Sequence, residues 1–248
     1  MKYQLDAACL CTMGKVRRNN EDNFSFDGQS LEAINRGLAS PLRFTRPLAG
    51  EEILCVFDGM GGENYGELAS YEAAQQLKRE LEAGGAHDEA ALTALCLRLN
   101  EAVFAQAQEL LTERMGTTVV GFAFTPERVL AFNLGDSRAY RLRGGELTQL
   151  SEDHVARRGS GKKSPLTQHL GIDPEELLLE PTVTESALEA GDRYLLCSDG
   201  LTDMLEDAQI AALLGKAASA AEAAETLIAA ALEAGGKDNV TAIVCRIL

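Results

Sequence analysis

The sequence lacks the features that usually mark a zinc site, a disulfide framework or a membrane anchor. Its six cysteines are scattered and no two of them form a CxxC pair, so we interpret them as buried free thiols. No run of eighteen or more apolar residues is present to span a bilayer. The opening MKYQLDAACLC contains one lysine and an acidic residue, unlike a secretory signal. We therefore expect a cytoplasmic protein without a membrane partner.

Basic residues are scarce relative to acidic ones. The chain of 248 residues has 23 Lys and Arg against 38 Asp and Glu, a formal net charge of −15. Nonspecific binding to nucleic acids or anionic membranes depends on neutralising phosphate with basic side chains, so both are excluded as main functions. Because no internal repeat or low-complexity linker is present, residues 1–248 are predicted to form a single domain, which we expect to be monomeric.

Apolar patterns predict strands and helices that come in clusters. Helices are predicted over 66–83 and 88–112, and near 207–214 and 218–233. Between them, GTTVVGFAF and the segments after it alternate with a period of two, which predicts antiparallel hairpins. Further strands are predicted at 3–12, 23–26, 53–57, 193–198 and 239–248. This order favours an α+β fold, with helices outside packed antiparallel sheets, over a parallel doubly wound sheet.

Carboxylates recur where predicted strands begin or end. Asp58 follows the apolar run EILCVF and precedes GMGG, and glycines there indicate a backbone that must approach a bound object closely. Any one of these acids could be a turn residue, but together they predict a carboxylate-lined cleft. Hard oxygen ligands without His or Cys favour Mg²⁺ or Mn²⁺. The other members of the set are Glu21, Asp22, Asp136, Asp199 and Asp238.

Seven ordered motifs resemble a known family. The segments GKVRRNNED, VFDGMGG, MGTT, LGDSRAYRLR, LSEDH, CSDGLTD and GKDNVTA are similar to those of the bacterial metal-dependent serine/threonine protein phosphatases of type 2C. The resemblance covers nearly the whole chain. It implies a four-layer αββα sandwich, in which two antiparallel sheets are flanked by helices and metal ions bind at one end.

The resemblance also implies a role for each carboxylate. Asp58 would bridge two Mn²⁺ or Mg²⁺ ions, with the Gly59 carbonyl and Glu21 on one ion and Asp199 and Asp238 on the other. Asp136, with Asp199, matches a third metal site of bacterial relatives, and the alternative for Asp136 is a turn cap. In the layer behind the ligands, Asp22 would hold metal-bound water and Asn239 would support Asp238.

Arg17 occupies the family's phosphate-binding position, and its planar guanidinium suits two phosphate oxygens. The implied reaction is hydrolysis of phosphoserine and phosphothreonine by direct attack of a metal-bridging water, with Arg17 and Asp58 catalytic and no phosphoenzyme. Met60 stands where animal members carry a histidine that serves as general acid. Many bacterial relatives also have methionine at this position. The donor of the leaving-group proton is therefore unassigned.

Two long connections fit no predicted element. One is an insertion near residues 27–50, with Arg36, Arg43 and Arg46, which could attract substrate or cover a sheet edge. The other resembles the family's flap and lies near residues 154–170, following the EDH motif that ends in His154. This flap carries four basic residues, which we predict to steer phosphorylated or acidic peptides to the cleft. They are Arg157, Arg158, Lys162 and Lys163.

Three functions stay open at this point. The first is an active phosphatase that opposes a bacterial serine/threonine kinase and acts on phosphorylated proteins, including the kinase and its targets. The second is a catalytically inactive binding module with the same fold, against which the presence of all expected ligands argues. The third is a phosphatase dedicated to a small phosphate ester or to the phosphoserine of a stress-pathway regulator.

Overall fold

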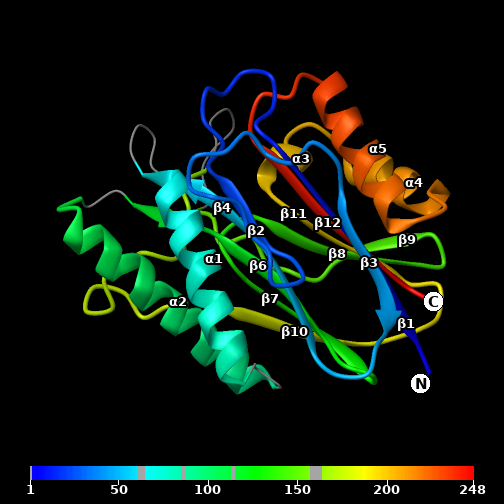
Figure 1. The fold of residues 1–248 in the computed structure, drawn as a ribbon, viewed down its shortest axis with the longest axis horizontal. Helices are drawn as coiled ribbons and strands as arrows, with labels where there is room; N and C mark the ends of the chain where they lie inside the picture. The colour runs from blue at the N-terminus through cyan, green and yellow to red at the C-terminus, as the bar shows by residue number, and fades with distance from the viewer. Residues whose placement is uncertain (1, 61–64, 85–87, 113–114, 157–163) are drawn as a thin grey trace.

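Two antiparallel sheets stack face to face at the centre of the structure (Figure 1). The computed structural model describes residues 2–60, 65–84, 88–112, 115–156 and 164–248. The first sheet has the order β3-β1-β12-β11-β8-β9. Its strands are β1 (Gln4–Thr12), β3 (Leu42–Pro47), β8 (Arg138–Arg143), β9 (Glu146–Gln149), β11 (Arg193–Cys197) and β12 (Val240–Ile247).

The second sheet has the order β10-β7-β6-β4-β2, and the short strand β5 pairs with β4. Its strands are β2 (Asp22–Ser25), β4 (Glu52–Met60), β5 (Gly116–Thr117), β6 (Val119–Phe124), β7 (Arg128–Leu134) and β10 (Thr182–Ala187). Side chains from the two inner faces form one apolar layer, in which the ring of Tyr194 meets Phe122 and Phe124 edge-on at 5.4 and 5.3 Å between centroids.

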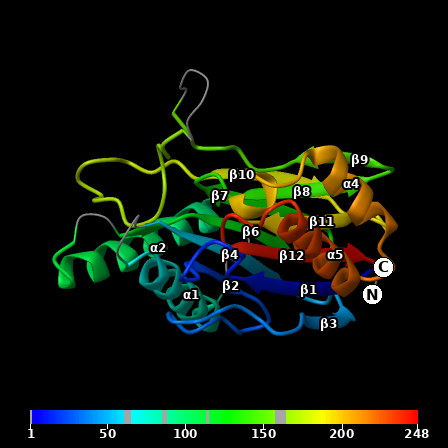
Figure 2. The same ribbon diagram turned by 90° about the horizontal axis from the view of Figure 1, so that it is seen from above.

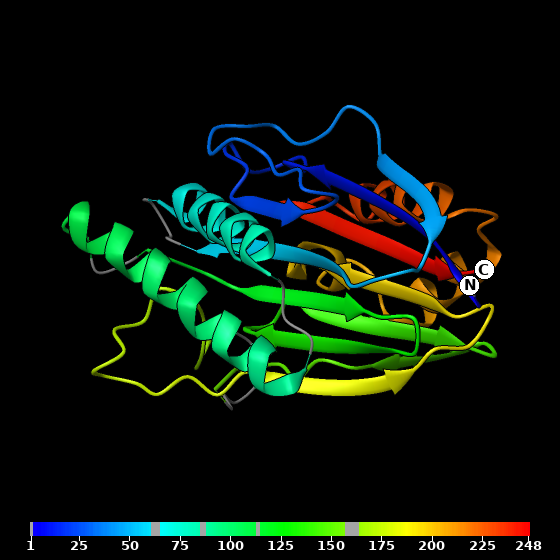
Figure 3. The same ribbon diagram turned by 60° about the horizontal axis from the view of Figure 1, so that its bottom comes forward.

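Helices cover the outer face of each sheet. Helices α1 (Gly66–Ala83) and α2 (Glu89–Glu109) bury their apolar stripes against the second sheet (Figure 3). Helices α4 (Asp207–Lys216) and α5 (Ala220–Glu233) do the same against the first, and the short α3 (Asp199–Thr202) follows β11. The four layers are therefore helix, sheet, sheet and helix, which confirms the predicted αββα sandwich. In the described part of the chain, no helix combines the length and apolarity needed to cross a membrane.

The pairing of β1 with β12 brings distant parts of the chain to one end of the sandwich. The register runs from Leu5 opposite Ile247 to Thr12 opposite Val240, so the two termini lie side by side (Figure 2). At the other end of this pair, the loop that follows β1 meets the turn that precedes β12. That turn contains Asp238 and the loop contains Arg17, which places two predicted site residues together.

The structure differs from the pattern-based expectation in several elements. Strand β4 continues to Met60, so Asp58 is the third residue from the end of this strand and does not lie beyond it. The predicted insertion near 27–50 contains β3, which pairs with β1 and forms the edge of the first sheet. Strand β10 and helix α3 were not predicted. Both are difficult to predict because β10 is a polar edge strand and α3 has only four residues.

Candidate active site

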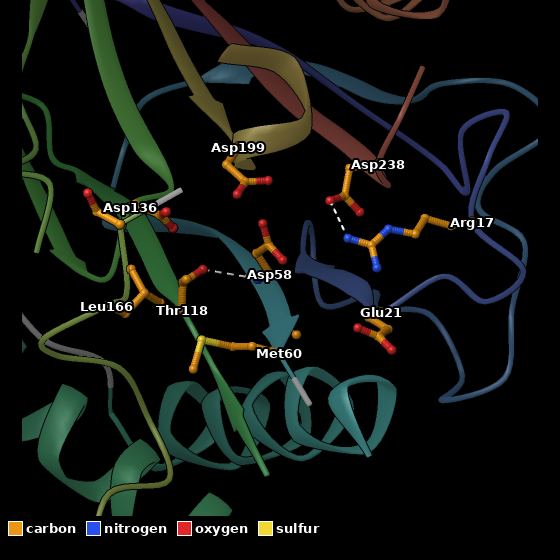
Figure 4. Close-up of a pocket in the computed structure, with 11 residues that line it drawn as sticks. Arg17, Glu21, Asp58, Met60, Thr118, Asp136, Leu166, Asp199 and Asp238 are labelled. Atoms are coloured by element: carbon orange, nitrogen blue, oxygen red, sulfur yellow. Dashed lines mark hydrogen bonds and ion pairs between the residues drawn. The ribbon is translucent and has the colours of Figure 1, made fainter. Parts of the chain in front are cut away.

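Arg17 and the predicted metal ligands line one cavity of about 200 Å³ where β4 and β11 end and β12 begins. Figure 4 shows Asp58 near its centre, with Asp136 on one side and Arg17 with Asp238 on the other. Seven segments that are separated in the sequence contribute to the cavity. Its lining comprises Arg17, Glu21, Asp58, Gly59, Met60, Thr118, Asp136, Ser164, Leu166, Asp199 and Asp238.

Asp58 is held in place through its own backbone. Its N–H donates to Thr118 Oγ1 at 3.1 Å, and its carbonyl accepts from Thr118 N at 2.9 Å. The Thr118 hydroxyl also lies 2.8 Å from the Ser137 hydroxyl, next to Asp136. These contacts fix the strand end that presents the Asp58 carboxylate to the cavity.

The glycine after Asp58 permits a close approach of three backbone segments. A Cβ on Gly59 would lie 2.1 Å from Gly66 O and 2.5 Å from Glu21 O, distances that real side chains do not tolerate. Gly59 N donates to Glu21 O at 3.0 Å. The glycine is therefore required for packing β4 against the start of α1 and the Glu21 segment, a reason that the motif alone did not reveal.

Asp199 and Asp238 are brought together by a second close approach. Asp199 is the first residue of α3 and is buried. A Cβ on the next residue, Gly200, would lie 1.9 Å from Asn239 O, so α3 rests directly on the turn that carries Asp238. The Asp238 carboxylate accepts from Asn239 N at 2.9 Å and from Arg17 Nη2 at 2.6 Å.

The side chain of Asn239 fastens the loop that carries Arg17 and Glu21. Its Oδ1 accepts from Glu21 N at 2.8 Å, and its Nδ2 donates to Met13 O and Asn19 O, both at 2.9 Å. Asn239 thus donates its backbone N–H to the Asp238 carboxylate and organises the opposite wall of the cavity through its amide, while its supporting role behind the metal ligands stays a prediction. The organising role of the amide could not be predicted from the motif GKDNV.

Charge in the cavity is only partly balanced. Burial and the carboxylate of Glu67 raise the pKa of Glu21, against the lowering effect of Arg17. Arg17 pairs with Asp238, and this hydrogen bond raises the pKa of the guanidinium. The lining offers carboxylate and backbone oxygens without His or Cys among the described residues. This donor set fits hard divalent cations, Mg²⁺ or Mn²⁺.

The carboxylates are not yet gathered around one point. In the described ranges, no group of three His, Cys, Asp or Glu side chains forms a ready ligand set. Arg17 instead supplies the positive charge next to Asp238. Binding of divalent ions would therefore require the acidic side chains that line the cavity to move closer together and Asp238 to exchange its arginine partner.

Asp22 lies behind the cavity and is not among its lining residues. Its buried carboxylate accepts from Ser198 Oγ at 2.7 Å and Thr241 Oγ1 at 2.6 Å, which connects β2 of one sheet with β12 of the other. Burial raises the pKa of Asp22 to about 7, although the two hydroxyl donors lower it. The water-holding role stays a prediction; the structure shows a residue that links the two sheets close to Asp199.

Asp136 follows a glycine turn that a buried histidine holds. Gly135 has a φ of +112°. Its backbone N–H donates to His154 Nδ1 at 3.1 Å, and its carbonyl accepts from the main-chain N–H of His154 at 3.0 Å. Burial lowers the pKa of His154, consistent with a neutral ring that accepts at Nδ1. Sequence reasoning noted His154 as the start of the flap but missed this contact with the turn that carries Asp136.

The described part of the flap reaches the cavity through Ser164 and Leu166. Leu166 forms a β-bridge with Val155, and Pro165 O accepts from Ala156 N at 2.9 Å. Residues 155–156 and 165–166 of the flap therefore lie side by side. The predicted substrate-steering residues Arg157, Arg158, Lys162 and Lys163 lie outside the described residues. Ser164 and Leu166 were not predicted, because no charge or motif distinguishes them.

Comparison with known proteins places this site in a family. The family model described as protein phosphatase 2C matches residues 43–235. The chain is 37% identical over 228 residues to the serine/threonine protein phosphatase PstP of Mycobacterium tuberculosis, covering 86% of this chain but only 44% of that longer relative. It is 30% identical over 250 residues to the serine/threonine phosphatase stp of Listeria welshimeri, covering 93% and 91% of the two chains.

Solved structures agree with the sequence matches. The catalytic domain of M. tuberculosis PstP, solved in complex with two manganese ions, superposes with a TM-score of 0.76 at 34% identity and 99% coverage of both chains. PppA of Pseudomonas aeruginosa superposes with a TM-score of 0.76 at 27% identity and 98% coverage of both. The fold, the cavity and the family match lead to the same assignment. The chain belongs to the protein phosphatase 2C family.

Proposed function

We propose that the chain is a metal-dependent serine/threonine protein phosphatase in which residues 1–248 form one catalytic domain. One observation carries the proposal. Six candidate oxygen ligands and a phosphate-binding arginine, drawn from distant segments, line a single cavity. A module that had lost catalysis would have no physical reason to retain mutually repelling carboxylates there.

The ligand assignment is the one that the family resemblance implies, and all the residues that it needs line the cavity. Asp58, at the centre, would bridge two ions. Glu21 and the Gly59 carbonyl would hold one ion, and Asp199 and Asp238 the other; Asp136, with Asp199, is proposed for a third. When bound, the ions supply an activated water as nucleophile and neutralise charge on the phosphoryl oxygens. The manganese ions in PstP support Mn²⁺ for this chain, with Mg²⁺ as the alternative.

Arg17 orients the substrate. Its guanidinium presents planar donors that engage two phosphate oxygens at once. In the structure one of its nitrogens bonds to Asp238, and the side chain is half exposed, so a phosphate can reach it from solvent. Thr118 holds the backbone of Asp58 on the opposite side. We therefore propose that the phosphorus lies between Arg17 and Asp58.

Substrates and location belong to the same proposal. We propose phosphoserine and phosphothreonine in proteins as the substrates, with a serine/threonine kinase and its targets as partners and a monomer in the cytoplasm as the working form. The six cysteines are all buried free thiols, a state typical of reducing compartments. The kinship with PstP and stp supports protein substrates.

The test is phosphate release from a phosphothreonine peptide by the purified chain in EDTA, Mg²⁺ or Mn²⁺. Metal-dependent turnover that is lost in Asp199→Ala would support the proposal. The matched control is Asp203→Ala, in the same short helical segment but absent from the cavity lining. A folded protein without turnover in any metal would favour the binding module instead. Turnover of small phosphate esters but no peptide would favour the dedicated phosphatase.

A further inference from the structure

Three loops pack into one surface on the Arg17 side of the cavity. Residues 13–20 join β1 to β2, residues 31–38 belong to the insertion, and residues 235–239 precede β12. Lys15 N donates to Gly236 O at 2.8 Å, which joins the first loop to the third. Asn20 Nδ2 donates to Asn35 Oδ1 at 2.6 Å, which joins the first to the second.

These loops gather exposed basic side chains in a strongly acidic protein. The net charge of −15 makes a local excess of positive charge unusual. Many arginines elsewhere are neutralised by a carboxylate, as Arg79, Arg98 and Arg128 are. By contrast, apart from Arg17, the exposed cations of the three loops form no ion pair with another described residue. They are Lys15, Arg18, Arg36 and Lys237.

Two exposed apolar side chains accompany the cations. Val16 is 64% exposed and Ile34 is 88% exposed. Val16 directly follows Lys15, and Ile34 lies two residues before Arg36. The hydrogen bond between Asn20 and Asn35 joins the two loops. Exposed apolar and cationic groups in one rigid patch are typical of a surface that binds a peptide, since the apolar groups bury area and the cations select charge.

The position of this patch relates it to the reaction. Val16 and Arg18 flank Arg17, and Lys237 precedes Asp238, so the patch borders the cavity directly. An extended peptide advances about 3.3 Å per residue. If its phosphate lies at Arg17, its next three or four residues extend about 10–13 Å over the patch.

The structure also separates the arginines of the insertion. Arg46 pairs with Asp27 at 2.8 Å and with Glu52 at 2.6 Å, and its guanidinium stacks on Phe44 at 4.0 Å from the ring centroid. It therefore fastens β3 to the second sheet and is occupied. Arg36, in the segment tied to Asn20 through Asn35, remains available. The β3 part of the insertion forms a sheet edge, one of the two roles predicted for it. The 31–38 part is joined by the Asn20–Asn35 hydrogen bond to the loop that contains Arg17.

We propose that this patch, formed by Lys15, Val16, Arg18, Ile34, Arg36 and Lys237, binds acidic residues that flank the phosphorylated residue of a protein substrate. The inference rests on the proposed phosphatase function and defines its substrate class. It predicts that peptides with glutamates beside phosphothreonine bind more tightly than peptides with serines there. The patch is expected to lower KM for such peptides, and this effect should weaken as salt is added because the cations are exposed.

The test compares a charge-reversal double variant with a matched control. Arg18→Glu/Arg36→Glu alters the patch. Lys78→Glu/Lys216→Glu makes the same charge change at exposed lysines on α1 and α4 that form no ion pair with another described residue. KM is measured for a phosphothreonine peptide flanked by glutamates and for the same peptide flanked by serines. The patch variant should raise the KM ratio of glutamate to serine peptide about tenfold or more, and the control by less than about twofold.

Equal KM changes for both peptides, or equal changes in the two double variants, would overturn the docking surface while leaving the phosphatase assignment intact. Absence of turnover by the unmodified protein would overturn the phosphatase assignment. In that case the dissociation constant of the fluorescein-labelled glutamate peptide, measured by anisotropy, still decides the docking surface. The same tenfold weakening confined to Arg18→Glu/Arg36→Glu supports it, and unchanged affinity refutes it.

Discussion

Replacing Asn239 with alanine tests whether one amide organises the wall of the cavity. The variant removes three hydrogen bonds, to Glu21 N, Met13 O and Asn19 O. The N–H of Glu21 then loses its acceptor in a half-buried position, which costs about 1–3 kcal/mol. The two carbonyls lie on a partly exposed loop and can be hydrated, so each loss costs about 0.5 kcal/mol. We expect the free energy of unfolding to fall by about 2–4 kcal/mol.

For a chain of 248 residues, this loss corresponds to a decrease in Tm of about 5–12 °C. Differential scanning calorimetry of the metal-free protein measures it. Asn239→Asp is the matched variant, since its carboxylate can still accept from Glu21 N but cannot donate to either carbonyl, and it adds a charge beside Asp238. A decrease below about 0.5 kcal/mol in Asn239→Ala would refute the claim that this side chain fastens the loop.

Three further predictions follow from the same structure. Gly59→Ala should lower the free energy of unfolding in urea by more than about 2 kcal/mol, because the added Cβ would collide with backbone atoms. The control Gly50→Ala, whose Cβ would have nothing within 4 Å, should change it by less than about 0.5 kcal/mol. Similar values for both variants would contradict this packing. Burial raises the pKa of Asp192, but hydrogen bonds, led by the one from Arg143, lower this pKa by a larger amount. The net pKa of Asp192 therefore lies below its ordinary value. The stability this provides is complete above about pH 4 and declines as pH falls through the folded pKa; unfolding at pH 6 and pH 3 should show this slope in the unmodified protein and a reduced slope in Asp192→Asn. Arg17→Ala should lower kcat/KM for a small aryl phosphate by about tenfold to a hundredfold, through loss of a charged hydrogen bond, and should raise the calorimetric affinity for Mn²⁺ because Asp238 loses its competing partner; an unchanged affinity would refute that competition.

Apolar patterning predicted the strands and helices where it is strong, whereas the four-layer arrangement was implied by the family resemblance. Buried strands such as β4 and β12, and helices such as α1, carry continuous or periodic apolar residues. Strand β10 was missed because it lies at a sheet edge, where burial does not impose a pattern. The insertion concealed β3 for a similar reason, since its residues alternate between half-buried and exposed positions.

The candidate site could be predicted as a set of residues but not as a geometry. Asp58, Asp199 and Asp238 stand in motifs at strand ends, and these motifs mark them individually. The pairing of Arg17 with Asp238 joins residues 221 positions apart, and no local pattern encodes it. His154 and Thr118 likewise act through contacts with distant backbone, which follow only from how the two sheets stack.

The most direct test of the account is the binding of Mn²⁺ to the metal-free protein by isothermal titration calorimetry. The central claim is that carboxylates from both sheets form one metal centre bridged by Asp58. We predict at least two equivalents of bound Mn²⁺ in the unmodified protein and loss of binding at both principal sites in Asp58→Asn. Retention of two tight sites in Asp58→Asn, or no binding by the folded unmodified protein, would contradict it.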